Sequence, residues 1–203
     1  MVDVITGAAT SGNYYLHWHL LNVASRPDTL QADLQREIDT VVGSDRLPGW
    51  EDHTSMPLTM ATIWEMFRWK IATPFNIPRL VGNDMKMDDY DIRKDTVVFP
   101  NLMTVHRDPK LWKNPDEFDP SRFLNPDGTA KTTKPDGLVT FSIGRRSCPA
   151  ENIALVEVFL YLTTLLQQFR ILPEDDKPII ITPFGPSPEL IDTRLRFFRR
   201  TEK

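Results

Sequence analysis

The pattern of apolar and polar positions predicts three helices in the first third of the chain. The first covers residues 1–24 and ends where Ser-Arg-Pro-Asp interrupts the pattern. The second begins near Leu30, carries apolar residues at four-residue intervals, and is expected to end before Gly43, because glycine commonly follows the last helical turn. The third covers residues 58–70, after a polar loop.

Short apolar segments between frequent prolines follow these helices. Residues 79–81 and 96–99 are predicted to be strands, because each is a short apolar run bounded by turn residues. Residues 107–140 combine prolines with large aromatic residues, which is typical of a long but ordered meander. Residues 141–168 read as a loop and then an apolar helix, and the tail 170–200 as strands and turns.

This order of elements predicts one domain over residues 1–203. Helices come first, then short strands, the meander, a further helix and a small sheet, without alternating β-α-β units or an internal repeat. The expected fold class is therefore mainly α with small β sheets, an α+β arrangement.

Composition and charge exclude several classes of function. The 203-residue chain has a net charge of −4, with 40% hydrophobic and 26% charged residues, as in soluble globular domains. It has no basic tract that would bind a phosphate backbone, so nucleic acid is not an expected partner. The most apolar segment, residues 153–166, is too short to span a bilayer, and no signal-peptide pattern opens the sequence. This chain is therefore expected to carry neither an anchor nor a signal.

The only cysteine lies in the stretch Phe-Ser-Ile-Gly-Arg-Arg-Ser-Cys-Pro-Ala, residues 141–150. A single thiol cannot form an internal disulfide, which fits a reducing compartment. A sulfur at a helix N-terminus is stabilised as the thiolate, and Arg145 and Arg146 add positive charge nearby. Gly144 permits a tight turn, and Ala150 is small enough for a flat ring system to lie close. The stretch therefore favours a metal-binding thiolate over a buried structural cysteine.

The spacing Phe-x-x-Gly-x-Arg-x-Cys-x-Ala resembles the cysteine-ligand loop of the cytochrome P450 superfamily, with alanine where the family usually has glycine. The resemblance implies that Cys148 is the sulfur ligand to the iron of haem b, whose electron donation favours O–O cleavage. It also implies that Arg146 pairs with a haem propionate and that Phe141 packs beside the loop. Gly144 and Ala150 belong to the same cofactor-binding loop.

Two further motifs resemble the family in order and spacing. Glu65 and Arg68 are three residues apart on a predicted helix and can form an ion pair, as in the family's Glu-x-x-Arg motif. Pro-Ser-Arg-Phe at residues 120–123 resembles the meander motif that supplies a second arginine, Arg122. The three charged residues are therefore expected to form a structural network and not to act as catalysts.

Two other residues acquire an expected role from the resemblance. Arg79 follows the Glu-x-x-Arg helix at the place where similar members hold a basic residue that binds a propionate. His106 belongs to a stretch that is familiar in the family, and it is interpreted as structural and not as an iron ligand.

The predicted helix 1–24 resembles the long helix that crosses the distal face of the haem. In the family, small residues leave a groove there for dioxygen, and an acid–threonine pair relays protons. The glycine and Thr10 match, which makes Thr10 the candidate catalytic residue. Ala9 stands where the family has the acid, so proton delivery is expected either to depend on Thr10, Ser11 and water or to be impaired.

The resemblance implies a haem-thiolate monooxygenase that inserts one atom of O2 into an apolar organic substrate. The microsomal, animal-type branch takes electrons from NADPH through NADPH–cytochrome P450 reductase, and in some cases from cytochrome b5. A full-length parent would lie at the cytosolic face of the endoplasmic reticulum membrane. By the same resemblance, the residues around Gly7 and those of the segments 72–77 and 182–186 would touch the substrate.

Family members are much longer than this chain, and the resemblance begins at the distal helix. The chain is therefore expected to be an incomplete piece, the C-terminal part of the cytochrome P450 fold, with one face of residues 14–23 exposed. Two other functions stay open. One is a catalytically inactive or truncated haem-binding product. The other is a haem-thiolate isomerase or dehydratase that needs no reductase, because Ala9 removes an acid that only oxygen activation requires.

Overall fold

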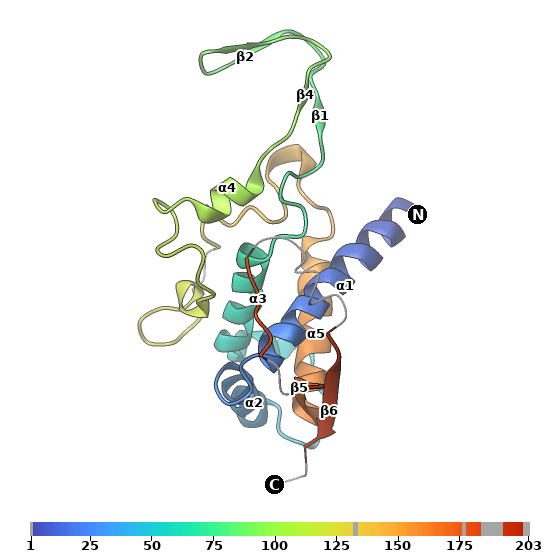
Figure 1. Cartoon of the computed structure of the whole chain (residues 1–203), viewed down its shortest axis with the longest axis vertical. Helices are drawn as coiled ribbons and strands as arrows, with labels where there is room; N and C mark the ends of the chain where they lie inside the picture. The colour runs from blue at the N-terminus through green and yellow to red at the C-terminus, as the bar shows by residue number, and fades with distance from the viewer. Residues whose placement is uncertain (1, 132–133, 176–177, 184–192, 201–203) are drawn as a thin grey trace.

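The computed structural model describes residues 2–131, 134–175, 178–183 and 193–200 (Figure 1). Helices make up most of the regular structure in these ranges, so the predicted fold class, mainly α with small sheets, is confirmed. The α-helices are α1 (Val2–Ala24), α2 (Leu30–Val41), α3 (Pro57–Trp69), α4 (Leu102–Arg107) and α5 (Glu151–Gln168). Short 3-10 helices cover Trp50–Ser55, Pro120–Phe123 and Gly144–Arg146.

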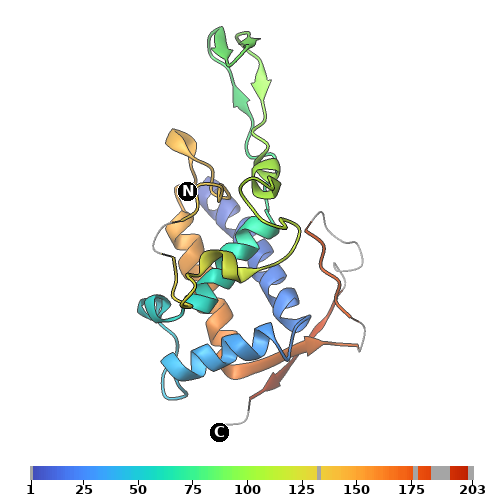
Figure 2. The same ribbon diagram turned by 90° about the vertical axis from the view of Figure 1, so that its left-hand side faces the viewer.

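The strands form small antiparallel pairs at opposite ends of the molecule. The pairs are β1 (Arg79–Leu80) with β4 (Val97–Val98), β2 (Met85–Met87) with β3 (Tyr90–Ile92), and β5 (Phe169–Pro173) with β6 (Leu195–Arg199). The first two pairs rise from the helical body as an arm, residues 79–98, which projects in Figure 1 and in the view turned by 90° (Figure 2). The β5–β6 pair lies at the other end, beside the last turn of α5.

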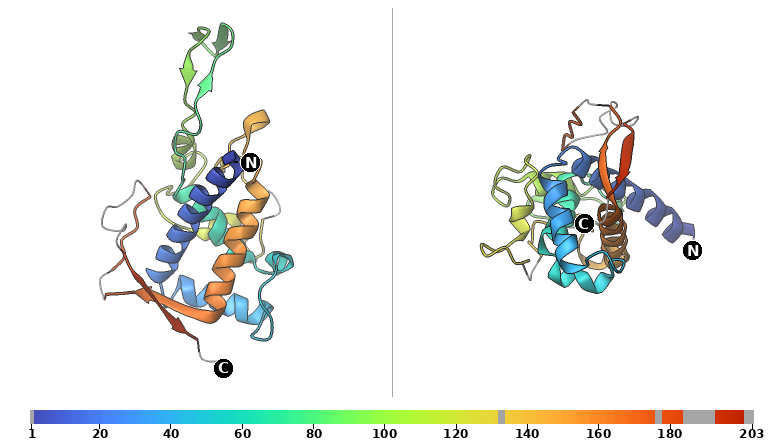
Figure 3. Two further views of the ribbon diagram at one scale, coloured as in Figure 1. Left: turned by 90° about the vertical axis from the view of Figure 1, so that its right-hand side faces the viewer. Right: turned by 90° about the horizontal axis from the view of Figure 1, so that it is seen from below.

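The core lies where α1, α3 and α5 meet, with α2 packed against α3 and α5 at one end (Figure 3). Tyr15 of α1 meets Phe67 of α3 edge-on, with ring centroids 4.4 Å apart. Leu162 of α5 and Ile38 of α2 are fully buried in the same cluster. Each such aliphatic side chain stabilises the fold by about 1.5–3 kcal/mol when it leaves water. None of the helices in the described ranges is both long and apolar enough to cross a bilayer.

The expectation that one face of residues 14–23 would be exposed is wrong. Tyr15, Trp18 and Leu21 are buried, because this half of α1 packs between α3 and α5. The exposed part of α1 lies earlier, where Ala9 and Thr10 face solvent. The buried apolar positions of residues 14–23 therefore have partners within this chain.

Candidate cofactor site around Cys148

Cys148 is exposed on the turn between the 3-10 helix Gly144–Arg146 and α5. Its backbone N–H donates to the carbonyl oxygen of Phe141 at 2.8 Å, which closes the loop on itself. Gly144 has a φ of 73°, in the left-handed region that favours glycine, and its carbonyl accepts from the N–H of Ser147 at 3.0 Å. The backbone of the loop therefore fixes the position of the thiol.

The loop is fastened to the core through the residues that open it. Phe141 is buried, and its ring lies 5.2 Å from that of Phe67 on α3. Thr140 donates from Oγ1 to the carbonyl oxygen of Phe67 at 2.7 Å. Because α3 is the central helix of the core, the position of Cys148 follows from that of α3.

The thiol also lies at the start of α5, where Ala150 is the N-cap residue and Glu151 the first helical residue. Backbone N–H groups at a helix start have no partner within the helix and carry partial positive charge. Ile143 and Ile153, on either side of Cys148 in the sequence, are 74% and 59% exposed. The thiol thus lies at a positive helix end, and two exposed apolar side chains occur within five residues of it in the sequence.

A hollow of about 360 Å³ adjoins the loop, and we call it the loop hollow. It is lined by arginines from two separate segments, Arg79 on β1 and Arg145 and Arg146 in the loop. Its apolar lining comes from Pro100, Leu102, Val105, Val139 and Ile143, with Ser142 beside them. Cys148 itself is not one of its lining residues. The structure therefore gathers Arg79 and Arg146, which were predicted from separate motifs, at one place.

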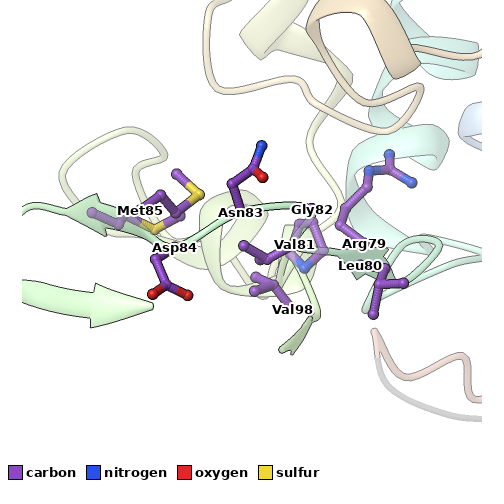
Figure 4. Close-up of a pocket in the computed structure, with 10 residues that line it drawn as sticks. Arg79, Leu80, Val81, Gly82, Asn83, Asp84, Met85 and Val98 are labelled. Carbon is purple, nitrogen blue, oxygen red and sulfur yellow. The ribbon is translucent and has the colours of Figure 1, made fainter. Parts of the chain in front are cut away.

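A larger hollow of about 550 Å³ lies along the arm, away from the loop (Figure 4). Arg79 stands at one end and Met85 at the other. Arg79 lines both hollows and donates from Nη1 to the carbonyl oxygen of Ile77 at 3.0 Å. The larger hollow brings no second arginine to Arg79, whereas the loop hollow brings Arg145 and Arg146, so the loop hollow is the better candidate site.

Glu65 is clasped by two guanidinium groups. Arg68 donates from Nε to Oε2 at 2.7 Å and from Nη2 to Oε1 at 2.8 Å, and both side chains are almost fully buried. Arg122 donates from Nε to Oε1 at 3.2 Å. The three residues that two separate motifs predict therefore lie together.

Arg68 extends this network to the segments around it. Its Nη1 donates to the carbonyl oxygens of His106 and Pro115, at 2.9 and 2.8 Å, and its Nη2 donates to that of Glu117 at 3.1 Å. The meander is thus held against α3 by charge-assisted hydrogen bonds. His106 is buried and accepts through Nε2 from the N–H of Val139 at 3.0 Å, two residues before Phe141.

The predicted relay residue lies on another element. Thr10 is exposed on α1, one residue after Ala9. Of the segments expected near a substrate, residues 72–77 include Phe75 and Ile77, which are exposed. Residues 184–186 of the segment 182–186 lie outside the described residues, whereas the carbonyl oxygen of Thr182 accepts from Nζ of Lys70 at 2.8 Å.

Two contacts near the site carry no local sequence signal. Nδ2 of Asn76 donates to Oγ of Ser142 at 2.9 Å and so joins the segment after α3 to the loop. Nζ of Lys70 lies 3.8 Å from the ring centroid of Trp18. Burial, together with the nearby charge of Arg107, lowers the pKa of Lys70 to about 8. The one hint in the sequence that Lys70 is buried is its position directly after the last residue of α3.

The donor set fits a haem. The described residues contain no group of three or more His, Cys, Asp or Glu side chains that could enclose a metal ion. A single thiolate suits an iron whose other ligands come from the cofactor. Arginines in the loop hollow suit carboxylate groups, and exposed Ile143 and Ile153 suit an apolar ring system. Cys148 would bind the iron, and Arg79 and Arg146 the propionates.

Comparison with known proteins gives the same assignment. The family model described as Cytochrome P450 matches residues 4–192. Cytochrome P450 2U1 of Homo sapiens is 39% identical over 183 residues, which are 89% of this chain and 33% of that protein. Cytochrome P450 1A5 of Gallus gallus is 42% identical over 170 residues, which are 83% of this chain and 32% of that protein. The chain thus spans about a third of the length of these curated relatives. Its motifs, its fold and these matches agree, and the chain belongs to the cytochrome P450 family.

Proposed function

We propose that the protein is a haem-thiolate monooxygenase that inserts one atom of O2 into an apolar organic substrate. The observation that carries the proposal is the exposed Cys148, held at the start of α5 beside a hollow that Arg79 and Arg146 line. The chain spans about a third of the length of its relatives. The activity is therefore proposed for a whole protein in which this chain is the part that carries Cys148.

A bound haem would supply the iron centre that binds and activates dioxygen, which amino-acid side chains cannot do alone. The residues of this chain would hold the haem, donate electron density to its iron and balance the negative charge of its propionates. Cys148 would donate electron density to the iron through sulfur. Arg146 and Arg79 would neutralise the propionates from two sides of the loop hollow. Phe141 and Gly144 would fix the loop, and Ala150 would leave room for the ring plane.

Protons would reach the site along α1. Thr10 would offer a hydroxyl that accepts one proton and passes on its own, with Ser11 and water continuing the path. Ala9 has no ionisable group, so proton delivery would depend on Thr10, Ser11 and water. The buried network of Glu65, Arg68 and Arg122 would take no part in this path, because its role would be to stabilise the fold.

The proposal includes the partners of the microsomal branch. Electrons would come from NADPH through NADPH–cytochrome P450 reductase, with cytochrome b5 as a second donor, at the cytosolic face of the endoplasmic reticulum membrane. Arg145 is exposed beside Cys148 and would offer positive charge to an acidic electron donor. The substrate would be apolar and would contact the exposed side chains of residues 72–77.

Ala9 favours a second candidate function. An isomerase or dehydratase rearranges an oxygenated substrate without a reductase, and it needs no acid for dioxygen. A catalytically inactive haem-binding product fits Ala9 as well.

The experiment that separates these functions measures oxygen consumption by the haem-loaded protein with lipid-like substrates. NADPH and reductase should both be required, and oxygen use should rise with substrate. A protein that gives a thiolate-type ferrous-carbonyl spectrum but consumes no oxygen would contradict the monooxygenase. Conversion of a lipid hydroperoxide by that protein would then support the isomerase or dehydratase.

A further inference from the structure

Residues 178–183 form a segment that is assigned to no helix or strand of the described chain. Their exposure nevertheless alternates as in a strand, and Ile179 and Ile181 are partly buried. These two side chains pack on a cluster of α1 and α3 residues that includes Trp18 and Trp69 (Figure 1). Because backbone carbonyl groups outside a ladder need other donors, the position of this segment depends on side chains.

Two cations hold consecutive carbonyl groups of this segment, and we call them the cation clamp. Nζ of Lys70 donates to the carbonyl oxygen of Thr182 at 2.8 Å, and Nη2 of Arg107 donates to that of Pro183 at 2.9 Å. Lys70 directly follows α3, and Arg107 is the last residue of α4, so each cation also lies at the negative end of a helix. Residues 182 and 183 are therefore fastened to two helices at once.

The ammonium group of Lys70 is enclosed by the fold. Lys70 is almost fully buried, and its Nζ lies 3.8 Å from the ring centroid of Trp18 on α1. Burial lowers the pKa of this group, and the nearby charge of Arg107 lowers it further. Burying a cation costs stability, whereas an apolar side chain of similar length would fill the space without that cost. Such a cost points to a use of the charge other than packing.

Lys70 also adjoins the other segment that is expected to face the substrate. Residues 72–77 begin two positions after it, and the N–H of Ala72 donates to the hydroxyl oxygen of Tyr15 on α1 at 3.1 Å. The described part of the expected segment 182–186 is held by the clamp itself. One lysine side chain therefore links the backbone of both segments.

We propose that Lys70 and Arg107 are positioning residues that fix residues 182–183 relative to residues 72–77 and so select which apolar chains the protein binds. The inference rests on the proposed monooxygenase function and concerns the specificity of the same site. Both side chains act through the segment that they hold, and their N–H groups are directed to backbone carbonyl oxygens. The clamp takes no part in proton or electron transfer.

The first test needs no cofactor. Methyl NMR of isoleucine-labelled chain follows Ile181, whose signal is assigned by its loss in Ile181→Val and is displaced by the aromatic rings on which the residue packs. Lys70→Met keeps the length of the side chain but removes the donor. The signal of Ile181 should then move most of the way to its random-coil position, because the segment is released.

Lys131→Met is the matched control. Nζ of Lys131 donates to the carbonyl oxygen of Arg122 at 2.7 Å, but in the meander, so this variant should leave the signal of Ile181 unchanged. The signal of Ile63, which is fully buried on α3, reports whether each variant is folded. An unmoved Ile181 signal in folded Lys70→Met would overturn the proposal.

Arg107→Gln removes the second cation and carries the test if Lys70→Met does not fold. It should move the signal of Ile181 in the same direction, because Pro183 loses its donor. In the folded double variant the two displacements should not add, since both substitutions release one segment. An unmoved signal of Ile181 in Arg107→Gln would overturn the proposal in that case.

The second test measures binding of N-alkylimidazoles to the haem-loaded protein by absorption spectroscopy. The imidazole ring binds haem iron, and the alkyl chain extends to the substrate side. Lys70→Met should raise the dissociation constant of dodecylimidazole about tenfold, which corresponds to the loss of one hydrogen bond to a charged group. Methylimidazole should bind both proteins equally, because its methyl group is too short to reach the segment.

This comparison separates positioning from a general loss of structure. A loosened fold would weaken both imidazoles, whereas a displaced segment weakens only the long one. Lys70→Arg keeps a cationic donor and should restore part of the affinity for dodecylimidazole. Equal affinities of Lys70→Met and the unmodified protein for dodecylimidazole would overturn the role of the clamp in specificity.

The two proposals fail in different ways. Absence of a thiolate-type carbonyl band in the unmodified protein would contradict the haem function, while the signal of Ile181 would still show whether the clamp holds its segment. A normal band with unchanged affinity for dodecylimidazole would contradict the inference on specificity alone.

Discussion

Glu65 and Arg68 form a bidentate ion pair in the interior of the molecule, with N–O distances of 2.7 and 2.8 Å. Every N–H of Arg68 has an acceptor, since two bonds go to Glu65 and three go to backbone carbonyl oxygens of α4 and the meander. Because all its N–H groups are hydrogen-bonded, the guanidinium of Arg68 joins α3 firmly to the segments that lead to the cysteine loop.

Arg68→Lys should therefore destabilise the protein severely. Lysine has three donors on one nitrogen and cannot copy the planar fork, so buried carbonyl groups and part of Glu65 would lose their partners. Breaking a buried ion pair costs about 3–5 kcal/mol, and the free energy of unfolding in urea should fall by an amount in this range.

The matched control is Arg36→Lys. Arg36 pairs with Asp33 at the same three-residue spacing, but both side chains are largely exposed. Exposed pairs contribute about 0–1 kcal/mol, so the control should unfold almost as the unmodified protein does. Equal losses in the two variants would show that burial of the network has no energetic effect.

Glu37 caps a helix other than its own. Its Oε1 accepts from the N–H of Leu58 and its Oε2 from that of Thr59, each at 2.8 Å, at the start of α3. Glu37→Gln removes the negative charge and one of the two acceptors, and should cost about 1–2 kcal/mol in urea unfolding. Asp39→Asn on the same helix removes only an exposed pair with Arg200 and should cost less than about 1 kcal/mol. A larger loss for Asp39→Asn would contradict this role.

His19 should make stability depend on pH. It is fully buried on α1, and burial lowers its pKa to about 3. An unfolded histidine has a pKa near 6.5, so below that pH the unfolded state binds more protons and folding stability declines as pH falls toward 3. At pH 5 this linkage removes about 2 kcal/mol relative to neutral pH.

The measurement compares unfolding free energies at pH 7.5 and pH 5. The unmodified protein should lose more than His19→Met by about 2 kcal/mol, because methionine fills the site without titrating. His106 has its pKa lowered to about 3 as well, by burial and then by the charge of Arg68, so His19→Met keeps a smaller pH dependence. Identical pH dependence in the two proteins would refute a buried neutral His19.

Gly144→Ala should strain the cysteine loop. The residue has a φ of 73°, and a Cβ there meets no atom within 4 Å, so the whole cost arises in the backbone. We expect a loss of about 1–2 kcal/mol in unfolding free energy. Gly82→Ala is the control, since its Cβ also meets open space but its φ lies outside the left-handed region. Equal effects of the two substitutions would contradict the need for glycine at 144.

Elements with strong local patterns could be predicted from the sequence. α5 spans Glu151–Gln168, where an unbroken apolar run predicts a helix, and α3 spans Pro57–Trp69, where the predicted range is 58–70. Glu65 and Arg68 could be paired in advance because a spacing of three residues places them on one side of a helix. Arg122 could be added only through the resemblance of its motif.

Elements without a periodic pattern could not be predicted in this way. α4 has six residues between Pro100 and Pro109, too few for a helical period, and its only signal is Asn101, whose Oδ1 accepts from the N–H of Thr104 at 3.1 Å. The β2–β3 pair is exposed on almost every residue, so it lacks the alternation that marks a half-buried strand.

Contacts between segments that are distant in the sequence also cannot be predicted from local patterns. Gly12 and Glu157 are far apart in the sequence, and their contact could not be predicted from the apolar pattern of α5, which reads as core packing. Lys70 likewise reads as a surface residue until Trp18 and the carbonyl oxygen of Thr182 are seen around its ammonium group.

The ligand bond of Cys148 is tested most directly by the ferrous-carbonyl difference spectrum of the protein with excess haem, recorded beside those of Cys148→Ser and Ser147→Ala. The unmodified protein and Ser147→Ala should give the thiolate-type band, and Cys148→Ser should lose it, because a hydroxyl oxygen does not replace the sulfur donor. A thiolate-type band that survives in Cys148→Ser would contradict the account.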